Sequence, residues 1–177
     1  IGIMGNMKTM LKFGLPLSAS VILNGFLIQF CNLLIAVRCA DEIIGNYQVA
    51  ANFAVLIGFF VTPIQTVLFP AFSKINPEKE VETLRNVFQF SVKYAALLVV
   101  PVAACVMAVS QPAIYTLFGE EYRFAPIYLT LYSINYLYSA FGTLSLENAL
   151  NGQGETKTTM KLALITTALG LPLSLLL

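Results

Sequence analysis

The sequence lacks histidine and tryptophan altogether, and aspartate occurs only once among its 177 residues, at Asp41. Its three cysteines, Cys31, Cys39 and Cys105, are odd in number and have neither the spacing of a metal site nor that of a disulfide framework. Two of them lie in or beside apolar runs, so we expect the cysteines to be packing residues. The sequence therefore predicts no cofactor and no bound metal.

Charge is also scarce. Only 11% of the residues are charged whereas 58% are hydrophobic, and the mean hydropathy is +0.78. A soluble domain of this composition would have too few polar side chains to cover its surface, so we predict an integral membrane protein whose first partner is the lipid bilayer. The net charge of +1 gives no indication of nucleic-acid binding. Because the chain begins without methionine and ends inside an apolar run, we expect a fragment of a longer polytopic protein.

Short polar breaks divide the chain into five hydrophobic spans. They cover approximately residues 11–37, 47–72, 87–109, 126–150 and 160–177, the last of them incomplete. Each span is too long for a barrel strand and none alternates strictly, so the predicted fold class is an all-α polytopic membrane protein with about five transmembrane helices in a single membrane domain.

The basic residues predict the orientation of these spans. Eight of the ten fall on one side, near the start of the chain or near the breaks at residues 73–86 and 151–159. Only Arg38 and Arg123 fall on the other side, with the acidic residues of the breaks at residues 38–46 and 110–125. The positive-inside bias therefore predicts that the chain enters from the cytoplasm, with the first pair of breaks cytoplasmic and the second pair extracellular.

The fourth span has two faces of different character. At 100° per residue, its polar and small residues fall within an arc of roughly 100°. These residues are Tyr128, Tyr132, Asn135, Ser139, Gly142 and Thr143, and apolar residues such as Ile134 and Phe141 lie opposite them. The span therefore reads as a single membrane helix with one lipid-facing side and one side that faces water or protein.

Two other spans carry a similar polar stripe. In the second span it includes Gln48, Asn52, Thr62 and Thr66, and in the first it includes Ser20, Asn24, Gln29 and Asn32. The three stripes form either a dry hydrogen-bonded contact or a water-filled cavity. We favour the cavity, because polar bonds within bilayers contribute only about 0.6–2 kcal/mol each. The candidate cavity residues are Asn24, Gln29, Asn32, Gln48, Asn52, Lys93, Tyr128, Tyr132, Asn135 and Ser139.

Few charged residues lie near the spans. Lys93, two turns into the third span, either extends to the cytoplasmic interface or contacts an anion at the mouth of the cavity. Glu147, near the inner end of the fourth span, is a candidate coupling site for a proton or cation, or a partner for a cytoplasmic lysine. Arg38 is interpreted as an interfacial anchor.

The order and spacing of several segments resemble a known family. These segments are FGLPLSAS, IGNYQVAANFAVLIGFFVTPIQTVLFPAFSKI, KYAALLVVP, LFGEEYRFAPIYL and ENALNGQGETK. Together they are similar to the polysaccharide-export flippases of the multidrug/oligosaccharidyl-lipid/polysaccharide exporter superfamily. No single segment is diagnostic, but the similarity extends over nearly the whole chain.

The resemblance implies a fold and a function. It implies the first five helices of the second lobe in a two-lobe exporter of 12–14 helices, with the N-terminal lobe of the same chain as a partner. It further implies a flippase, not an enzyme, that moves an isoprenoid-linked oligosaccharide or polysaccharide precursor across the plasma membrane by alternating access. Two lobes related by pseudo-symmetry would enclose the cavity.

The chain also departs from the family pattern. The arginines that commonly hold the carrier pyrophosphate in this family have no counterpart in mid-span here, so the first lobe would have to supply them. Asn32 stands in the sequence FCNLL where the family usually has an aspartate, which weakens a role for it in ion coupling.

Two other functions remain as alternatives. A drug/cation antiporter of the same superfamily would be expected to carry acidic residues deep in this lobe, and only Glu147 comes close. A membrane glycosyltransferase would need loop carboxylates for a metal and a sugar nucleotide, yet the chain has no D-x-D sequence.

Overall fold

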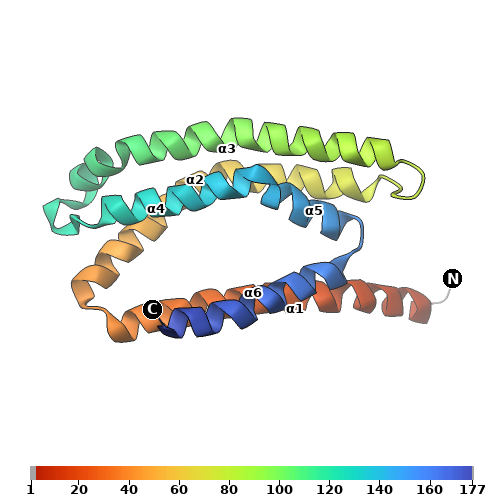
Figure 1. Ribbon diagram of the computed structural model, residues 1–177, viewed down its shortest axis with the longest axis horizontal. Helices are drawn as coiled ribbons and strands as arrows, with labels where there is room; N and C mark the ends of the chain where they lie inside the picture. The colour runs from red at the N-terminus through yellow and green to blue at the C-terminus, as the bar shows by residue number, and fades with distance from the viewer. Residues whose placement is uncertain (1–2, 177) are drawn as a thin grey trace. The chain divides into compact units, whose positions relative to one another are not determined.

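The computed structural model describes the backbone of residues 3–176, and the side chains at Met7, 10–138 and 141–176. The described backbone is helical, and strands are absent from it, which confirms the predicted all-α class. The main helices are α1 (Ile3–Arg38), α2 (Asp41–Ser73), α3 (Val81–Phe118), α4 (Ala125–Tyr138), α5 (Leu144–Gly152) and α6 (Thr156–Leu176). A short helix, η1 (Glu120–Tyr122), follows α3, and a π-type turn, η2 (Ser139–Thr143), joins α4 to α5 (Figure 1).

Four helices of the described chain are long and apolar enough to cross a membrane: Met10–Arg38 of α1, α2, α3 and α6. No more than 17% of the most apolar stretch in any of them is buried. Large hydrophobic side chains cover the exposed helix faces, as expected for a protein whose solvent is lipid. The chain is therefore a polytopic membrane protein, as the composition predicts.

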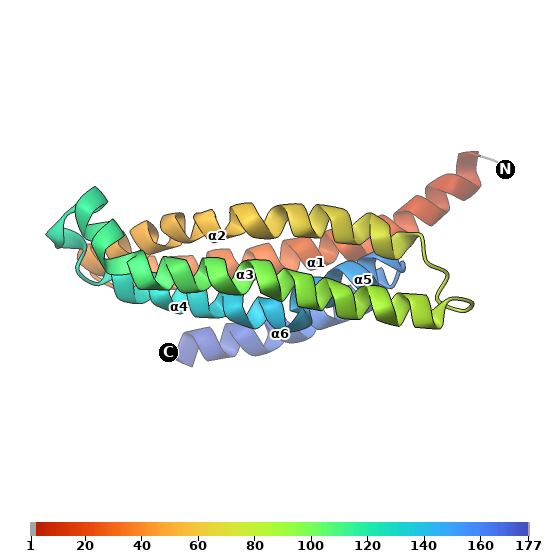
Figure 2. The ribbon, with the colours of Figure 1, turned by 90° about the horizontal axis from the view of Figure 1, so that it is seen from above.

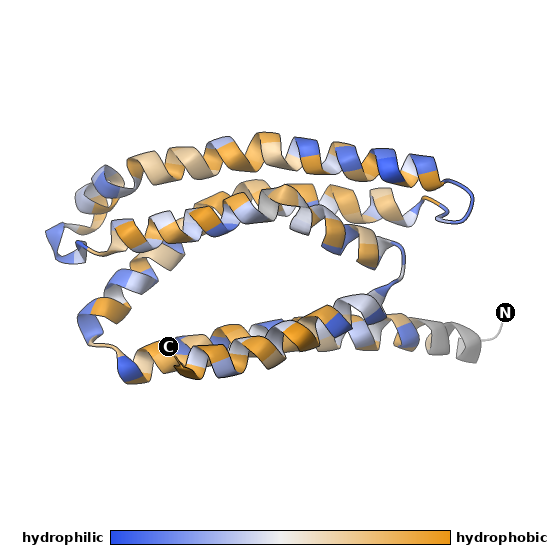
Figure 3. Cartoon of the chain, viewed as in Figure 1, coloured by the Kyte–Doolittle hydropathy of each residue, from blue (hydrophilic) through white to orange (hydrophobic). Residues whose placement is uncertain are grey.

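The helices extend beyond the apolar spans from which we predicted them. The third predicted span, residues 87–109, lies inside the 38-residue helix α3. Figure 3 shows hydrophilic residues on the first turns of α3 and on the loop before it, followed by a largely hydrophobic stretch. Helical hydrogen bonding thus continues past the apolar part of the sequence, because polar side chains can extend from the helix ends into water.

The fourth predicted span is not one continuous helix, so this prediction was wrong. Its helical geometry breaks at Phe141 (φ −74°, ψ 16°) and Gly142 (φ 117°, ψ −7°). A residue with a side chain rarely adopts a positive φ such as that of Gly142, whereas glycine does so without steric cost. The periodicity that placed Gly142 and Thr143 on the same face as Tyr128 therefore does not apply beyond the end of α4 at Tyr138.

The helices pack as two compact units, each of which is described by itself. The first contains α1 and α6, which lie side by side (Figure 1). The buried face of α6 includes Thr159, Ala163 and Thr167, and a Cβ added to Gly170 would lie only 2.9 Å from Cδ2 of Leu27. These small residues let the two helices approach closely, as is usual between membrane helices.

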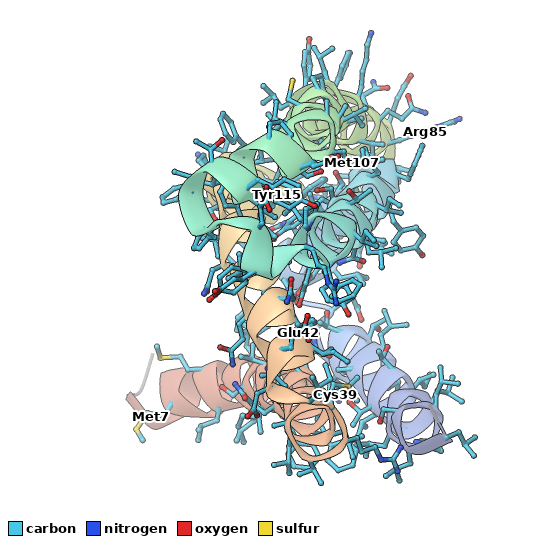
Figure 4. All side chains as sticks on the ribbon, turned by 90° about the vertical axis from the view of Figure 1, so that its left-hand side faces the viewer. Met7, Cys39, Glu42, Arg85, Met107 and Tyr115 are labelled. Carbon is cyan, nitrogen blue, oxygen red and sulfur yellow. The ribbon has the colours of Figure 1, made fainter. Side chains whose placement is uncertain are left out.

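The second unit contains α2, α3, α4 and the beginning of α5. Figure 2 shows α2 beside α3, and both helices contact α4. Small buried residues again lie at the contacts, including Ala50 and Ala54 of α2 and Ala103 of α3. Figure 4 views the unit end-on, from the end at which Glu42 and Tyr115 lie.

Candidate functional site

Two tyrosines from different helices make a direct contact within the second unit. The hydroxyl of Tyr132, on α4, donates a hydrogen bond of 2.6 Å to the hydroxyl of Tyr47, on α2. Their ring centroids are 5.7 Å apart, and the ring of Tyr128 packs edge-on against Tyr47 at 6.5 Å. Because Tyr128 and Tyr132 are four residues apart on α4, both face the same turn of α2.

These rings border an open hollow of about 330 Å³, which we call the tyrosine hollow. Its lining residues are Tyr47, Tyr128, Leu131, Tyr132 and Asn135. Three of the predicted cavity residues, Tyr128, Tyr132 and Asn135, are thus brought together. The lining contains aromatic rings, hydroxyls and one carboxamide, but no charged side chain. Such a surface can hydrogen-bond uncharged hydroxyl groups and pack against the apolar faces of a ligand.

Asn46 holds α2 and α4 in the register that this contact needs. Its side chain is 1% exposed, and Nδ2 donates to the Glu42 carbonyl at 2.7 Å. Oδ1 accepts from the amides of Phe124 and Ala125 at 3.0 and 2.9 Å, and so satisfies N–H groups at the start of α4. A capping role that a neighbouring residue usually performs is here performed by a residue 79 positions earlier in the chain.

The sequence analysis missed Tyr47 and Asn46. Both belong to the segment IGNYQVAAN, but we counted only the stripe that begins at Gln48. The buried positions Asn46, Ala50, Ala54 and Ile57 repeat every three or four residues, and they mark the packed face of α2. An asparagine in the first position of that repeat was the available signal for a buried polar contact.

Gln48 and Asn52 lie outside the hollow. Both are exposed, and at 100° per residue each lies about 160° from Ala50 on the helical projection of α2. They therefore occupy the face of α2 opposite its packed positions. This arrangement keeps them available to a ligand or to another part of the protein.

The structure does not bring the charged candidates to the hollow. Lys93 is exposed on α3 and Glu147 is exposed on α5, and neither is among the lining residues. An ion pair joins Arg123 to Glu42, at 3.5 Å, and both of its side chains are more than half exposed.

The remaining predicted cavity residues do not line the hollow between α2 and α4. Asn24 and Gln29 are exposed on α1. Asn32, on the same helix, is half-buried and interacts with another residue of the chain. All three belong to the first unit. The side chain of Ser139 lies outside the described residues. Among the side chains that are described, no three of the histidine, cysteine, aspartate or glutamate type gather closely enough to hold a metal ion.

Comparison with known proteins gives two matches. Residues 3–126 match a family described as "Polysaccharide biosynthesis protein". The chain is also similar to the lipopolysaccharide biosynthesis protein WzxC of Escherichia coli (strain K12), with 32% identity over 114 residues. That alignment covers 64% of this chain but only 23% of the relative, so the chain matches less than a quarter of the relative's length. No solved structure matches the chain significantly.

Proposed function

Because the chain belongs to the polysaccharide biosynthesis protein family, we propose that it forms part of a membrane transporter that flips a lipid-linked oligosaccharide or polysaccharide precursor across the plasma membrane. The match to WzxC supports the same reading, since that relative is named for lipopolysaccharide biosynthesis. The rest of the protein, including a preceding lobe, completes the cavity and the alternating-access machinery in this proposal.

The observation that carries the proposal is the uncharged hollow between α2 and α4. A flippase must pass a hydrated sugar headgroup through the membrane, so its path must bind sugar hydroxyls and then release them. The hydroxyls of Tyr47 and Tyr132 and the carboxamide of Asn135 can bind in this way without the desolvation cost of buried ions. The tyrosine rings add flat apolar surfaces against which pyranose rings can stack.

The proposed topology has five crossings. Within their unit α1 and α6 run in the same direction, because Arg38 at the end of α1 donates to the carbonyl of Leu175 near the end of α6. If both helices span the bilayer, the chain between them must cross it an odd number of times. The helices α2 and α3 supply two crossings, and α4, η2 and α5 together supply the third.

The third of these crossings needs all three of its parts. The 14 residues of α4 rise only about 21 Å, whereas the hydrocarbon core is about 30 Å thick. The proposed sidedness follows the basic residues: the loops before α3 and α6 face the cytoplasm, and those before α2 and α4 face outward.

The proposal is tested by replacing Tyr132 and Asn135 together with leucine in the full-length protein. We expect surface glycan to fall while the amount of protein in the membrane stays near normal, because a lost interhelical hydrogen bond costs only about 0.6 kcal/mol on average in a membrane. Both quantities are measured in the same strain.

Tyr138→Leu is the matched control, since Tyr138 also lies on α4 but is 66% exposed and is not among the residues that line the hollow. Undiminished export by the double variant, at normal abundance, would remove this hollow from the transport path. A loss of protein in proportion to export would assign Tyr132 and Asn135 a structural role instead.

A further inference from the structure

Ser145 is a buried serine whose hydroxyl makes no hydrogen bond within the described part of the chain. It is the second residue of α5 and is 0% exposed. A buried hydroxyl without a partner is unfavourable, because nothing replaces the bond that it would make to water. Since α5 follows η2 directly, the unsatisfied hydroxyl lies next to the break between α4 and α5.

The other buried serines of the described chain all satisfy their hydroxyls in the same way. Each donates to a backbone carbonyl three or four residues earlier on its own helix, at 2.7–2.8 Å, as serine commonly does in membrane helices. These serines are Ser20, Ser91, Ser110 and Ser133.

The break between α4 and α5 explains why Ser145 differs from them. The carbonyls three and four residues before Ser145 belong to Gly142 and Phe141, the two residues whose backbone angles are not helical. Because the backbone angles set the direction of each carbonyl, the break removes the acceptors that a continuous helix would offer to Ser145.

Little packing holds α5 in its present direction. Among its residues only Leu144 and Ser145 are buried, and residues 146–152 are exposed or half-buried. Within η2 itself, the side chain of Phe141 is 80% exposed. A rotation of α5 about η2 therefore moves few buried side chains.

We propose that η2 is a hinge with a broken state and a continuous state. In the broken state, which the structure shows, Gly142 has a positive φ and the Ser145 hydroxyl has no acceptor. In the continuous state Gly142 adopts helical angles, and Ser145 donates to the carbonyl of Phe141 or Gly142. Glycine suits both states because neither φ has a steric cost for it. The unsatisfied hydroxyl weakens the broken state, so the continuous state is accessible as a minor population.

The hinge changes the direction of α5 relative to α4. The division between the two compact units falls within α5, after Ala149, and α5 leads along the chain to α6. A change at η2 therefore reorients one of the two chain segments that connect these units. This motion belongs to the fold itself and does not depend on which solute the protein moves.

Spin labels on the full-length protein distinguish the two states. In a cysteine-free background, labels at Arg85→Cys on α3 and Glu147→Cys on α5, both exposed positions, report the distance between the two helices by pulsed electron paramagnetic resonance. Gly142→Ala should populate a second distance, because alanine is unfavourable at a φ of 117° and shifts the ratio of continuous to broken molecules about tenfold. Adding Ser145→Ala should lower that ratio about fivefold, because residue 145 then gains no hydrogen bond in the continuous state.

Two comparisons keep the test decisive. Gly25→Ala is the control for the distance measurement, since Gly25 is a helical glycine of α1 with open space around it, and it should leave the distances unchanged. If Gly142→Ala folds poorly, the thermal unfolding of Ser145→Ala is compared with that of Ser133→Ala, which is equally buried but donates to the Leu129 carbonyl. Ser145→Ala should unfold at the higher temperature, because it removes a hydroxyl that has no partner.

Three outcomes would overturn the hinge. The first is a single distance that wild type and Gly142→Ala share. The second is a second distance in Gly142→Ala whose population Ser145→Ala leaves unchanged. The third is unfolding of Ser145→Ala at or below the temperature of Ser133→Ala, which would show that the Ser145 hydroxyl is bonded in the main state.

Discussion

Replacing Asn46 with alanine removes three hydrogen bonds at the contact between α2 and α4. One is the bond to Glu42 on the same helix, and the other two come from the amides of Phe124 and Ala125. The Ala125 amide is buried, so without Oδ1 it has no access to water. A buried donor left unsatisfied costs about 1–3 kcal/mol, and the part-buried Phe124 amide adds about 1 kcal/mol. We therefore expect Asn46→Ala to destabilise the protein by about 2–4 kcal/mol.

Asn46→Asp separates the two functions of this side chain. Aspartate keeps an acceptor for the α4 amides, and its charge is favourable at a helix N-terminus. It loses only the donor to the Glu42 carbonyl, so the expected destabilisation is about 1 kcal/mol. The control is Asn52→Ala, because Asn52 lies on the same helix but is exposed, and its removal should change stability by less than about 0.5 kcal/mol.

The assay is denaturant unfolding of the full-length protein in detergent, followed by circular dichroism. The expected order of stability is wild type, then Asn52→Ala, Asn46→Asp and Asn46→Ala. If Asn46→Ala were as stable as Asn52→Ala, the amides at the start of α4 would not depend on Asn46, and the account of how Tyr47 is placed against Tyr132 would be wrong.

Three other predictions concern separate features. A double-mutant cycle with Tyr47→Phe and Tyr132→Phe should give a coupling energy of about 0.6 kcal/mol in unfolding experiments, and a value near zero would mean that the hydroxyls do not interact. Gly142→Ala should cost about 1–3 kcal/mol because of its φ of 117°, whereas Gly25→Ala, with open space around it, should not destabilise; equal effects would contradict the break between α4 and α5. In a cysteine-free background, Asp41→Cys and Glu120→Cys should react with an impermeant thiol reagent on intact cells, and labelling of Glu78→Cys before lysis would reverse the proposed orientation.

Composition and hydropathy were enough to predict the membrane class and the all-α fold. Fifty-eight per cent hydrophobic residues in long runs leave few alternatives to membrane helices. The order of the segments also led to the correct family, which the match over residues 3–126 confirms. The membrane class, the helical fold and the family each depend on continuous stretches of sequence, so they can be predicted without the structure.

The break between α4 and α5 was not predicted, because helical periodicity assumes that every residue adds 100°. On a helical projection the sequence SAFGT continues the polar stripe of α4. In the structure, however, Gly142 has a positive φ and Phe141 has a ψ of 16°. A glycine in a membrane span is compatible with both a continuous helix and a break. Periodicity alone does not distinguish them; in the structure a Cβ added to Gly142 would lie 3.5 Å from Cγ2 of Val92, on α3.

The tyrosine hollow was predicted in part. Its α4 side, Tyr128, Tyr132 and Asn135, follows from the periodicity of one helix. Its α2 side does not, because the bond between Tyr132 and Tyr47 joins residues 85 positions apart. The participation of Lys93, Gln48 and Asn52 in a common cavity stays a prediction.

The pairing of α1 with α6 has a consequence for how the protein is made. About 120 residues separate Arg38 from Thr156, and a ribosome that adds about 5–20 residues per second needs roughly 6–24 s to synthesise them. Throughout this interval the helix that packs against Leu27 does not yet exist. The contact between α1 and α6 can therefore form only after α2, α3, α4 and α5 have been synthesised.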